Sequence, residues 1–317
     1  MDDSNNVYEK IGLMSDIVIT SDEFMTAFNG IRNCVKRSIA YKEPIGSMLL
    51  AKGGLGKTTL CNTIVSQMPR SIKVEEDCQK TIIPAFYVEV PSPATVKSLA
   101  ITMLQELGDP TYSSGTTEQL TARLRYLLAE CETELVFLDE FHHLFDRKTS
   151  STRMNVTVGN WLKTLVNKTG ISFCLVGLPE FAELLQVDTQ IARRFQFIYT
   201  LNPLSIETLQ GEGTIYSFLS AISNKLSEQG ISFSPELDSP LLGMQIIIGT
   251  NGYHSYIMSL IRESVINALI NGRHHVTLED FSEAWHLGIT LYISKQNKNP
   301  FDMSVSQISS ILKSRNE

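Results

Sequence analysis

The chain of 317 residues is 43% hydrophobic, 19% charged and 8% aromatic, as in an ordinary globular protein of about two domains. These figures exclude a disordered chain, a collagen and a disulfide scaffold. The net charge of −7 excludes a uniformly basic surface, so any nucleic-acid contact must come from a local patch. The acidic N-terminal segment and the lack of an apolar run of about 18–20 residues predict a cytoplasmic protein with no secretory signal and no membrane contact.

Short apolar runs alternate with amphipathic stretches over the first two-thirds of the chain. This alternation predicts a parallel β-sheet covered by helices on both faces. The expected strands are residues 47–50, 85–90, 134–139, 171–176 and 195–201. The expected helices between them are residues 57–67, 95–107, 117–130 and 155–167.

Helical spacing replaces the strand pattern after Pro203. Thr277 is the expected N-cap of the last of these helices, because acidic residues follow it. The polar end of the chain carries one weak apolar stripe at 305–312, which is either a short docking helix for a partner or a frayed tail. The helices expected in this second region are residues 206–229, 237–248, 253–269 and 277–288.

A glycine-rich turn lies between the strand expected at 47–50 and the helix that begins at Lys57. Its residues 51–58 have the spacing of a P-loop, with Ala51 in place of the motif's first glycine. In such a loop the backbone N–H groups point at phosphate oxygens, next to the positive end of a helix. We therefore predict that ATP and Mg²⁺ bind here, with Lys57 at the β- and γ-phosphates and the Thr58 hydroxyl on the metal. The predicted cofactor-binding residues are Gly53, Gly54, Leu55, Gly56, Lys57, Thr58 and Thr59.

A second motif, at residues 135–140, consists of four apolar residues followed by Asp139 and Glu140. The carboxyl end of this strand would direct Asp139 towards the metal, through the metal's water shell. Glu140 would polarise the attacking water as a general base. Paired with the P-loop, this motif predicts ATP hydrolysis.

Two adjacent arginines, Arg193 and Arg194, precede the last expected strand. Ring-forming ATPases place an arginine here that reaches the γ-phosphate of a neighbouring subunit. The alternative is a pair of solvated surface arginines. His142 and His143 follow the Asp-Glu strand without a third ligand at metal spacing, so packing or the orientation of Glu140 is their expected role.

Together these motifs resemble the AAA+ superfamily, and three segments are similar to the TniB/TnsC/MuB group of transposition regulators. In that group an Asp-Glu strand end, a Leu-Lys-x-Leu helix, a Val-Gly strand end and an Arg-Phe pair recur in this order. The segments here are VFLDEFHHLFDRK at 136–148, WLKTLVNKTGISFCLVGLPE at 161–180 and QIARRFQFIYTLNPL at 190–204.

The resemblance implies an α/β P-loop AAA+ core followed by a smaller, all-helical lid. The organisation expected from it and from the composition is an N-terminal extension at 1–25, the nucleotide-binding core at 26–203, the lid at 204–293 and a polar C-terminal tail at 294–317.

The function that the resemblance implies is ATP-dependent assembly of a homo-oligomeric ring or filament on duplex DNA, which links a target-site selector to a transposase. ATP hydrolysis would control disassembly in a bacterial, nucleoid-associated complex. The absence of a polar sensor after the strand at 171–176 predicts slow turnover that assembly or partners stimulate. The DNA contacts of the group map to Lys97, with Thr116 or Arg123 on the next helix.

Two other functions also fit the motifs. One is an AAA+ initiator or loader, which would usually carry a further DNA-reading domain after the lid. The other is a P-loop signalling switch that acts on protein partners rather than DNA.

Overall fold

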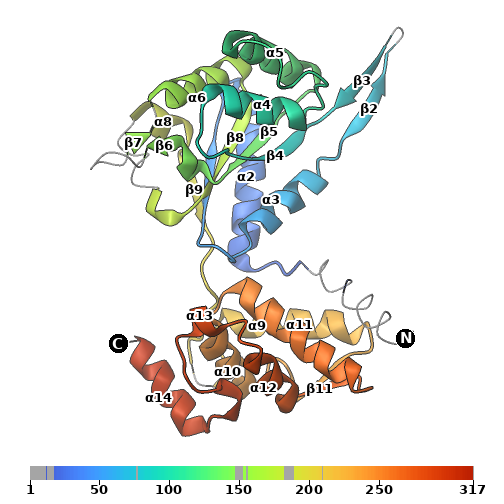
Figure 1. Ribbon diagram of the computed structural model, residues 1–317, viewed down its shortest axis with the longest axis vertical. Coiled ribbons are helices and arrows are strands. Elements are labelled where there is room, and N and C mark those ends of the chain that lie inside the picture. Colours follow the sequence, from blue (N-terminus) through green and yellow to red (C-terminus); the bar gives the residue numbers. More distant parts are fainter. Residues whose placement is uncertain are drawn as a thin grey trace. The chain divides into compact units, whose positions relative to one another are not determined.

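The computed structural model describes residues 12, 18–75, 78–146, 153–154, 156–181, 189–208 and 210–316 (Figure 1). They divide into a core unit, residues 23–201, and a helical unit, which comprises residues 202–317 together with 1–22. The division after residue 201 lies close to the boundary expected at 203. No helix in the described ranges is long and apolar enough to cross a membrane.

The core unit is built on one sheet of five parallel strands, in the order β4-β5-β8-β1-β9. All five expected strands are present, and their carboxyl ends share one edge of the sheet. This edge therefore collects the turns that follow β1 and β5. The strands are β1 (Ser47–Leu50), β4 (Ala85–Glu89), β5 (Leu135–Asp139), β8 (Ser172–Gly177) and β9 (Phe197–Thr200).

Helices cover both faces of this sheet, as predicted. One face packs against α4 (Val96–Glu106), α5 (Thr117–Glu130) and α6 (Val156–Thr169). The other face packs against α2 (Asp22–Tyr41) and α3 (Lys57–Ser66).

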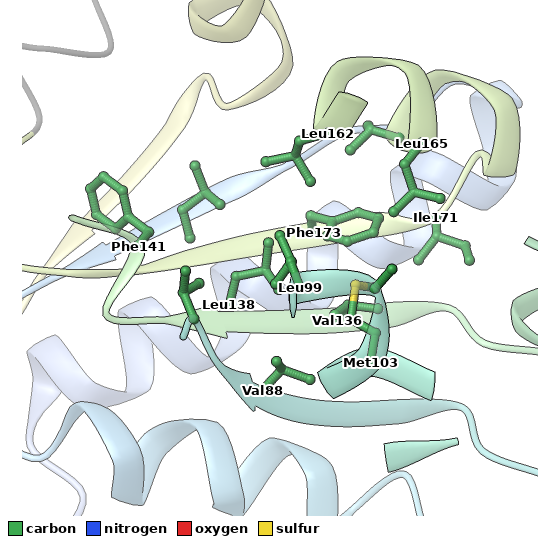
Figure 2. Close-up of a cluster of buried hydrophobic side chains, with 14 of the residues drawn as sticks. Val88, Leu99, Met103, Val136, Leu138, Phe141, Leu162, Leu165, Ile171 and Phe173 are labelled. Carbon is green, nitrogen blue, oxygen red and sulfur yellow. The ribbon is translucent and has the colours of Figure 1, made fainter. Parts of the chain in front are cut away.

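The interior beneath α4 and α6 consists of large aliphatic and aromatic side chains from three neighbouring strands (Figure 2). Alternate residues of each strand point into it, as the period of two requires. Because these side chains are almost fully buried, they fix the register of β4, β5 and β8. The labelled members are Val88, Leu99, Met103, Val136, Leu138, Phe141, Leu162, Leu165, Ile171 and Phe173.

Helix α2 lies partly within the expected N-terminal extension and was not predicted. Its buried residues recur at the spacing of three to four that marks one face of a helix, from Phe24 to Val35. The extension is thus shorter than expected, and its described end, 18–22, belongs to the helical unit. There the Lys225 ammonium donates a hydrogen bond to the Val18 carbonyl at 3.0 Å.

A β-hairpin between α3 and β4 was also not predicted. Its strands, β2 (Ser71–Val74) and β3 (Gln79–Ile82), pair antiparallel. Ile72 and Val74 alternate with polar residues, as is typical of a strand, but the pattern is only four residues long and all four side chains are exposed. Two ion pairs tie the hairpin to the end of α5, from Lys73 to Glu132 at 2.7 Å and from Lys80 to Glu130 at 3.1 Å.

The remaining short elements of the core unit flank segments outside the described residues. They are β6 (Phe145–Asp146), which pairs antiparallel with β7 (Arg153–Met154), the 3₁₀ turns η2 (Phe141–Leu144) and η3 (Pro179–Phe181), and α8 (Thr189–Arg194).

The helical unit contains the four helices expected after Pro203, with one late start. Its first helix begins at 214 rather than 206, because Gly211 and Gly213 adopt φ angles of 106° and 137° that a helix cannot accommodate. A short parallel strand pair, β10 (Ser232–Ser234) and β11 (His275–Thr277), was not predicted. The helices are α9 (Thr214–Ser227), α10 (Pro240–Thr250), α11 (His254–Ile270), α12 (Leu278–His286), α13 (Leu291–Ser294), the 3₁₀ turn η4 (Pro300–Asp302) and α14 (Val305–Asn316).

The end of the chain differs from the expected polar tail. The stripe forms helix α14, and Ile308 and Leu312 are buried in the interior of the helical unit. Gln245 on α10 also donates hydrogen bonds to the carbonyls of Pro300 and Phe301 at 3.1 and 3.3 Å. The segment 294–316 is therefore an integral part of this unit, which buries Ile308 and Leu312 of the apolar stripe and leaves Val305 exposed.

Arg273, just before β11, forms an ion pair with the buried Asp280 on α12. Asp280 is 1% exposed and accepts hydrogen bonds from the Arg273 guanidinium at 2.6 and 2.8 Å and from the Thr277 backbone N–H at 2.7 Å. Burial raises the pKa of Asp280, but the bonds from Arg273 and Thr277 outweigh it and hold this pKa below its usual value. The carboxylate thus stabilises the fold above the pKa of the unfolded chain, and this stabilisation is lost as the pH falls through the lower folded pKa.

We expect Asp280→Asn to reduce the free energy of unfolding at pH 7 by about 2–3 kcal/mol, since it leaves Arg273 without its carboxylate. Denaturant unfolding at pH 7 and at pH 3 measures the effect, which should shrink at the lower pH. Glu279→Gln, at the exposed neighbouring position, is the control. A loss of equal size at both pH values would contradict this account of the pair.

Candidate nucleotide site

The glycine-rich turn connects β1 to α3 at the carboxyl edge of the sheet. Gly54 and Gly56 have φ angles of 78° and 92°, in the left-handed region that favours glycine, and Gly56 is the N-cap of α3. No atom lies within 4 Å of the position that a Cβ would take on Gly53 or Gly56. The loop backbone is thus open on this side, as an approaching phosphate chain requires.

Ala51, the departure from the glycine pattern, directly follows β1 and is fully buried. Its backbone N–H donates to the carbonyl of Gly177 at the end of β8, at 3.0 Å. The methyl group is accommodated inside the sheet and does not enter the loop.

Lys57 opens α3 and is 8% exposed. Its ammonium donates to the carbonyls of Ala51 and Lys52, at 2.8 and 3.3 Å. These bonds hold the cation against the loop itself. Thr58 and Thr59, the next two residues, are exposed.

Asp139 ends β5 and is 3% exposed. One carboxylate oxygen accepts the backbone N–H of Glu140 at 2.7 Å, and the other accepts the phenol of Tyr87 on β4. The Thr58 side chain lies beside the same phenol. The Thr58 hydroxyl and the Asp139 carboxylate thus meet across one phenol, and such hard oxygen donors fit Mg²⁺.

Glu140 directly follows the strand in a left-handed conformation, with φ at 53°. For a residue other than glycine this conformation is uncommon and often marks a functional position. Its carboxylate is partly exposed, and Nδ1 of the buried His142 lies 2.9 Å from its Oε2. This is the arrangement expected of a histidine that orients Glu140.

Arg193 and Arg194 end α8, at the opposite end of the sheet from the P-loop. The Arg194 carbonyl accepts a hydrogen bond from the backbone N–H of Gly46, just before β1, at 2.7 Å. Both arginines line a pocket of about 340 Å³ together with Arg37, whose guanidinium stacks over Phe197 at 4.8 Å. Because β1 separates them from Lys57, they lie away from the phosphate site of their own subunit.

The three residues predicted to contact DNA differ in the contacts that their side chains make within the chain. Lys97 is exposed on α4. Thr116 caps α5 and accepts the backbone N–H of Gln119. Nε of Arg123 lies 2.6 Å from Oδ2 of the buried Asp109, and its guanidinium donates a hydrogen bond to the Thr111 carbonyl at 2.7 Å. The Arg123 side chain thus stabilises the turn before α5.

Sequence reasoning missed Tyr87. Its position in an apolar strand favoured a packing role. The sequence places Tyr87 in an expected strand, and the structure pairs this strand with β5. The parallel register sets Tyr87 opposite Phe137 and Glu89 opposite Asp139. Tyr87 and Asp139 therefore share one face of the sheet.

A P-loop after β1, a buried aspartate at the end of β5 in the same parallel sheet and a following helical unit define an AAA+ protein. The family model described as "Bacterial TniB protein" matches residues 16–202, more than half of the chain. The chain therefore belongs to the TniB family.

Solved structures share the fold at low sequence identity. ORC2 of Aeropyrum pernix, solved as ADPNP–ADP complexes, has a TM-score of 0.58 and 16% identity over 81% of this chain and 65% of its own. ORC1 of Aeropyrum pernix, solved in complex with DNA, has a TM-score of 0.54 and 14% identity over 82% and 64%. Cdc6p of Pyrobaculum aerophilum has a TM-score of 0.59 and 14% identity over 86% and 69%.

The chain thus spans about two-thirds of the length of these proteins. At such identities the likeness establishes the AAA+ fold alone. No curated protein matches the sequence significantly.

Proposed function

We propose that this protein is an ATP-dependent regulator of DNA transposition that assembles on duplex DNA as a ring or filament. In this role it links a target-site selector to a transposase, and hydrolysis of ATP releases the assembly. The observation that carries the proposal is that the TniB family match spans the whole core unit, which holds the complete P-loop and Asp-Glu pair.

The residues of the site have separate tasks in the proposed reaction. The open loop backbone and Lys57 bind the phosphates. Thr58 and Asp139 would hold Mg²⁺, which neutralises phosphate charge when bound. Glu140, oriented by His142, accepts a proton from the attacking water.

Electron microscopy of the protein with duplex DNA and ATP tests the proposal. We expect DNA-bound rings or filaments with ATP and their loss with ADP. Monomers bound to neither DNA nor each other would contradict it and favour a signalling switch. Assembly at one defined DNA sequence only would instead favour an initiator.

Recruitment of a transposase to DNA distinguishes this proposed role from that of other proteins that assemble on DNA. The transposase should be retained on DNA by the protein with ATP and be released with ADP. A transposase that binds equally in both nucleotide states would contradict the proposed link.

A prediction for DNA binding rests on Lys97, whose side chain is exposed on α4. We expect Lys97→Ala to weaken DNA binding about equally for all sequences. The salt dependence should flatten by about 1 unit of slope for each phosphate that the variant no longer neutralises. Binding isotherms at several salt concentrations measure both effects.

Lys36→Ala, an exposed lysine on α2, is the matched control for charge. An unchanged affinity and slope in Lys97→Ala would remove Lys97 from the DNA-binding surface. Arg123 is unsuitable for this test, because its replacement would also release the turn at Asp109.

A further inference from the structure

The phenol of Tyr87 stands between the two side chains expected to hold the metal. It donates a hydrogen bond to the Asp139 carboxylate, and the Thr58 side chain lies beside it. These residues come from three separate elements, β4, α3 and β5. The contact therefore joins the P-loop helix to the Asp-Glu strand.

The direction of these hydrogen bonds follows from their chemistry. The Asp139 carboxylate can only accept, so Tyr87 donates its hydroxyl proton to it. The phenol oxygen keeps lone pairs that can accept from the Thr58 hydroxyl. A Thr58 hydroxyl that donates to the phenol would leave its own lone pairs for a cation.

We propose that Tyr87 is a positioning residue of the nucleotide site, which sets the Thr58 hydroxyl and the Asp139 carboxylate in the arrangement that a magnesium–nucleotide complex requires. The inference rests on the proposed function of this site. Tyr87 acts through the metal-binding side chains and not on the phosphates, so it should affect only the gain in affinity that Mg²⁺ provides.

Fluorescence titration of the full chain with N-methylanthraniloyl-ADP, in EDTA and in excess Mg²⁺, tests this inference. Tyr87→Phe retains the ring and removes the hydroxyl that bonds to Asp139. Its affinity in EDTA should equal that of the parent protein. In Mg²⁺ it should bind about 5- to 10-fold more weakly, as expected for the loss of one hydrogen bond.

Tyr199→Phe is the matched control, because Tyr199 is a partly buried phenol of the same sheet that contacts Cys34 on α2. It should match the parent protein in both buffers. Thermal unfolding without nucleotide shows that both variants are folded.

A double-mutant cycle with Thr58→Ala separates positioning from a general structural effect. If Tyr87 acts through Thr58 and Asp139, Tyr87→Phe should cost less than about 2-fold in the Thr58→Ala background. Equal weakening in EDTA and Mg²⁺, no weakening, or full additivity with Thr58→Ala would each overturn the inference. If the parent protein binds no nucleotide, the proposed function itself fails.

Discussion

Lys57→Ala is expected to abolish ATP binding at any practical nucleotide concentration. Lys57 supplies the charged donor of the P-loop, and losing two charge-assisted hydrogen bonds to phosphate weakens binding about 100-fold or more. The structure holds this ammonium at the loop, 2.8 Å from the Ala51 carbonyl. Isothermal titration calorimetry with ATP and Mg²⁺ measures the loss.

Glu140→Gln separates hydrolysis from binding in the same site. The amide retains the size of the side chain and cannot accept the proton of the attacking water. Hydrolysis should therefore fall about 10²- to 10⁴-fold, while ATP affinity stays at the parental level and the DNA-bound assembly persists.

The controls are Lys168→Ala, an exposed lysine at the end of α6, and Glu134→Gln, at the opposite end of β5 from Glu140. Both should bind and hydrolyse ATP like the parent. Parental hydrolysis in Glu140→Gln would assign the base to another residue. Normal ATP binding by Lys57→Ala would place the nucleotide elsewhere.

Arg194→Ala should bind ATP normally as a monomer and lose both assembly and DNA-stimulated hydrolysis. Arg194 lies near the start of β1, whereas Lys57 of the same subunit lies beyond the end of β1. Arg194 can therefore neutralise γ-phosphate charge only in a neighbouring subunit. An arginine supplied in this way commonly accelerates hydrolysis by about 10³-fold or more. ATPase rates measured against protein concentration, with and without DNA, test this.

Mixing the Arg194→Ala and Lys57→Ala proteins should restore part of the activity. A mixed interface can pair an intact phosphate site on one subunit with an intact arginine on the other. Arg125→Ala, an exposed arginine on α5, is the control. If Arg194→Ala assembles and hydrolyses ATP like the parent, Arg193 becomes the next candidate.

Hydrophobic patterning and glycine spacing were sufficient to predict most of the core unit. The five strands of the sheet are short buried runs bounded by turns, and the P-loop has a spacing that few other structures require. Each of these signals lies within a short segment of the chain, so it can be recognised in a single sequence without knowledge of tertiary contacts. The Asp139–Glu140 strand end was found in the same way.

Other features depend on contacts between distant segments. The β2 strand is exposed along its length and is held by pairing with β3. The sequence of β2 alone does not show which segment it pairs with. Helix α14 is polar enough to suggest a tail, yet Ile308 inserts into the interior of the helical unit. Tyr87 acquires its role only because the parallel register brings β4 beside β5.

The arginines at one end of the sheet and the P-loop at the other give each subunit a direction. In the proposed assembly, contacts between such ends would be heterologous, so copies would add head to tail and form a closed ring or an open helix. In an open helix, one terminal subunit always has a phosphate site that no neighbour completes. We expect that subunit to keep its ATP longest. If copies add at this end, hydrolysis trails behind growth and the older parts of the assembly are the first to come apart.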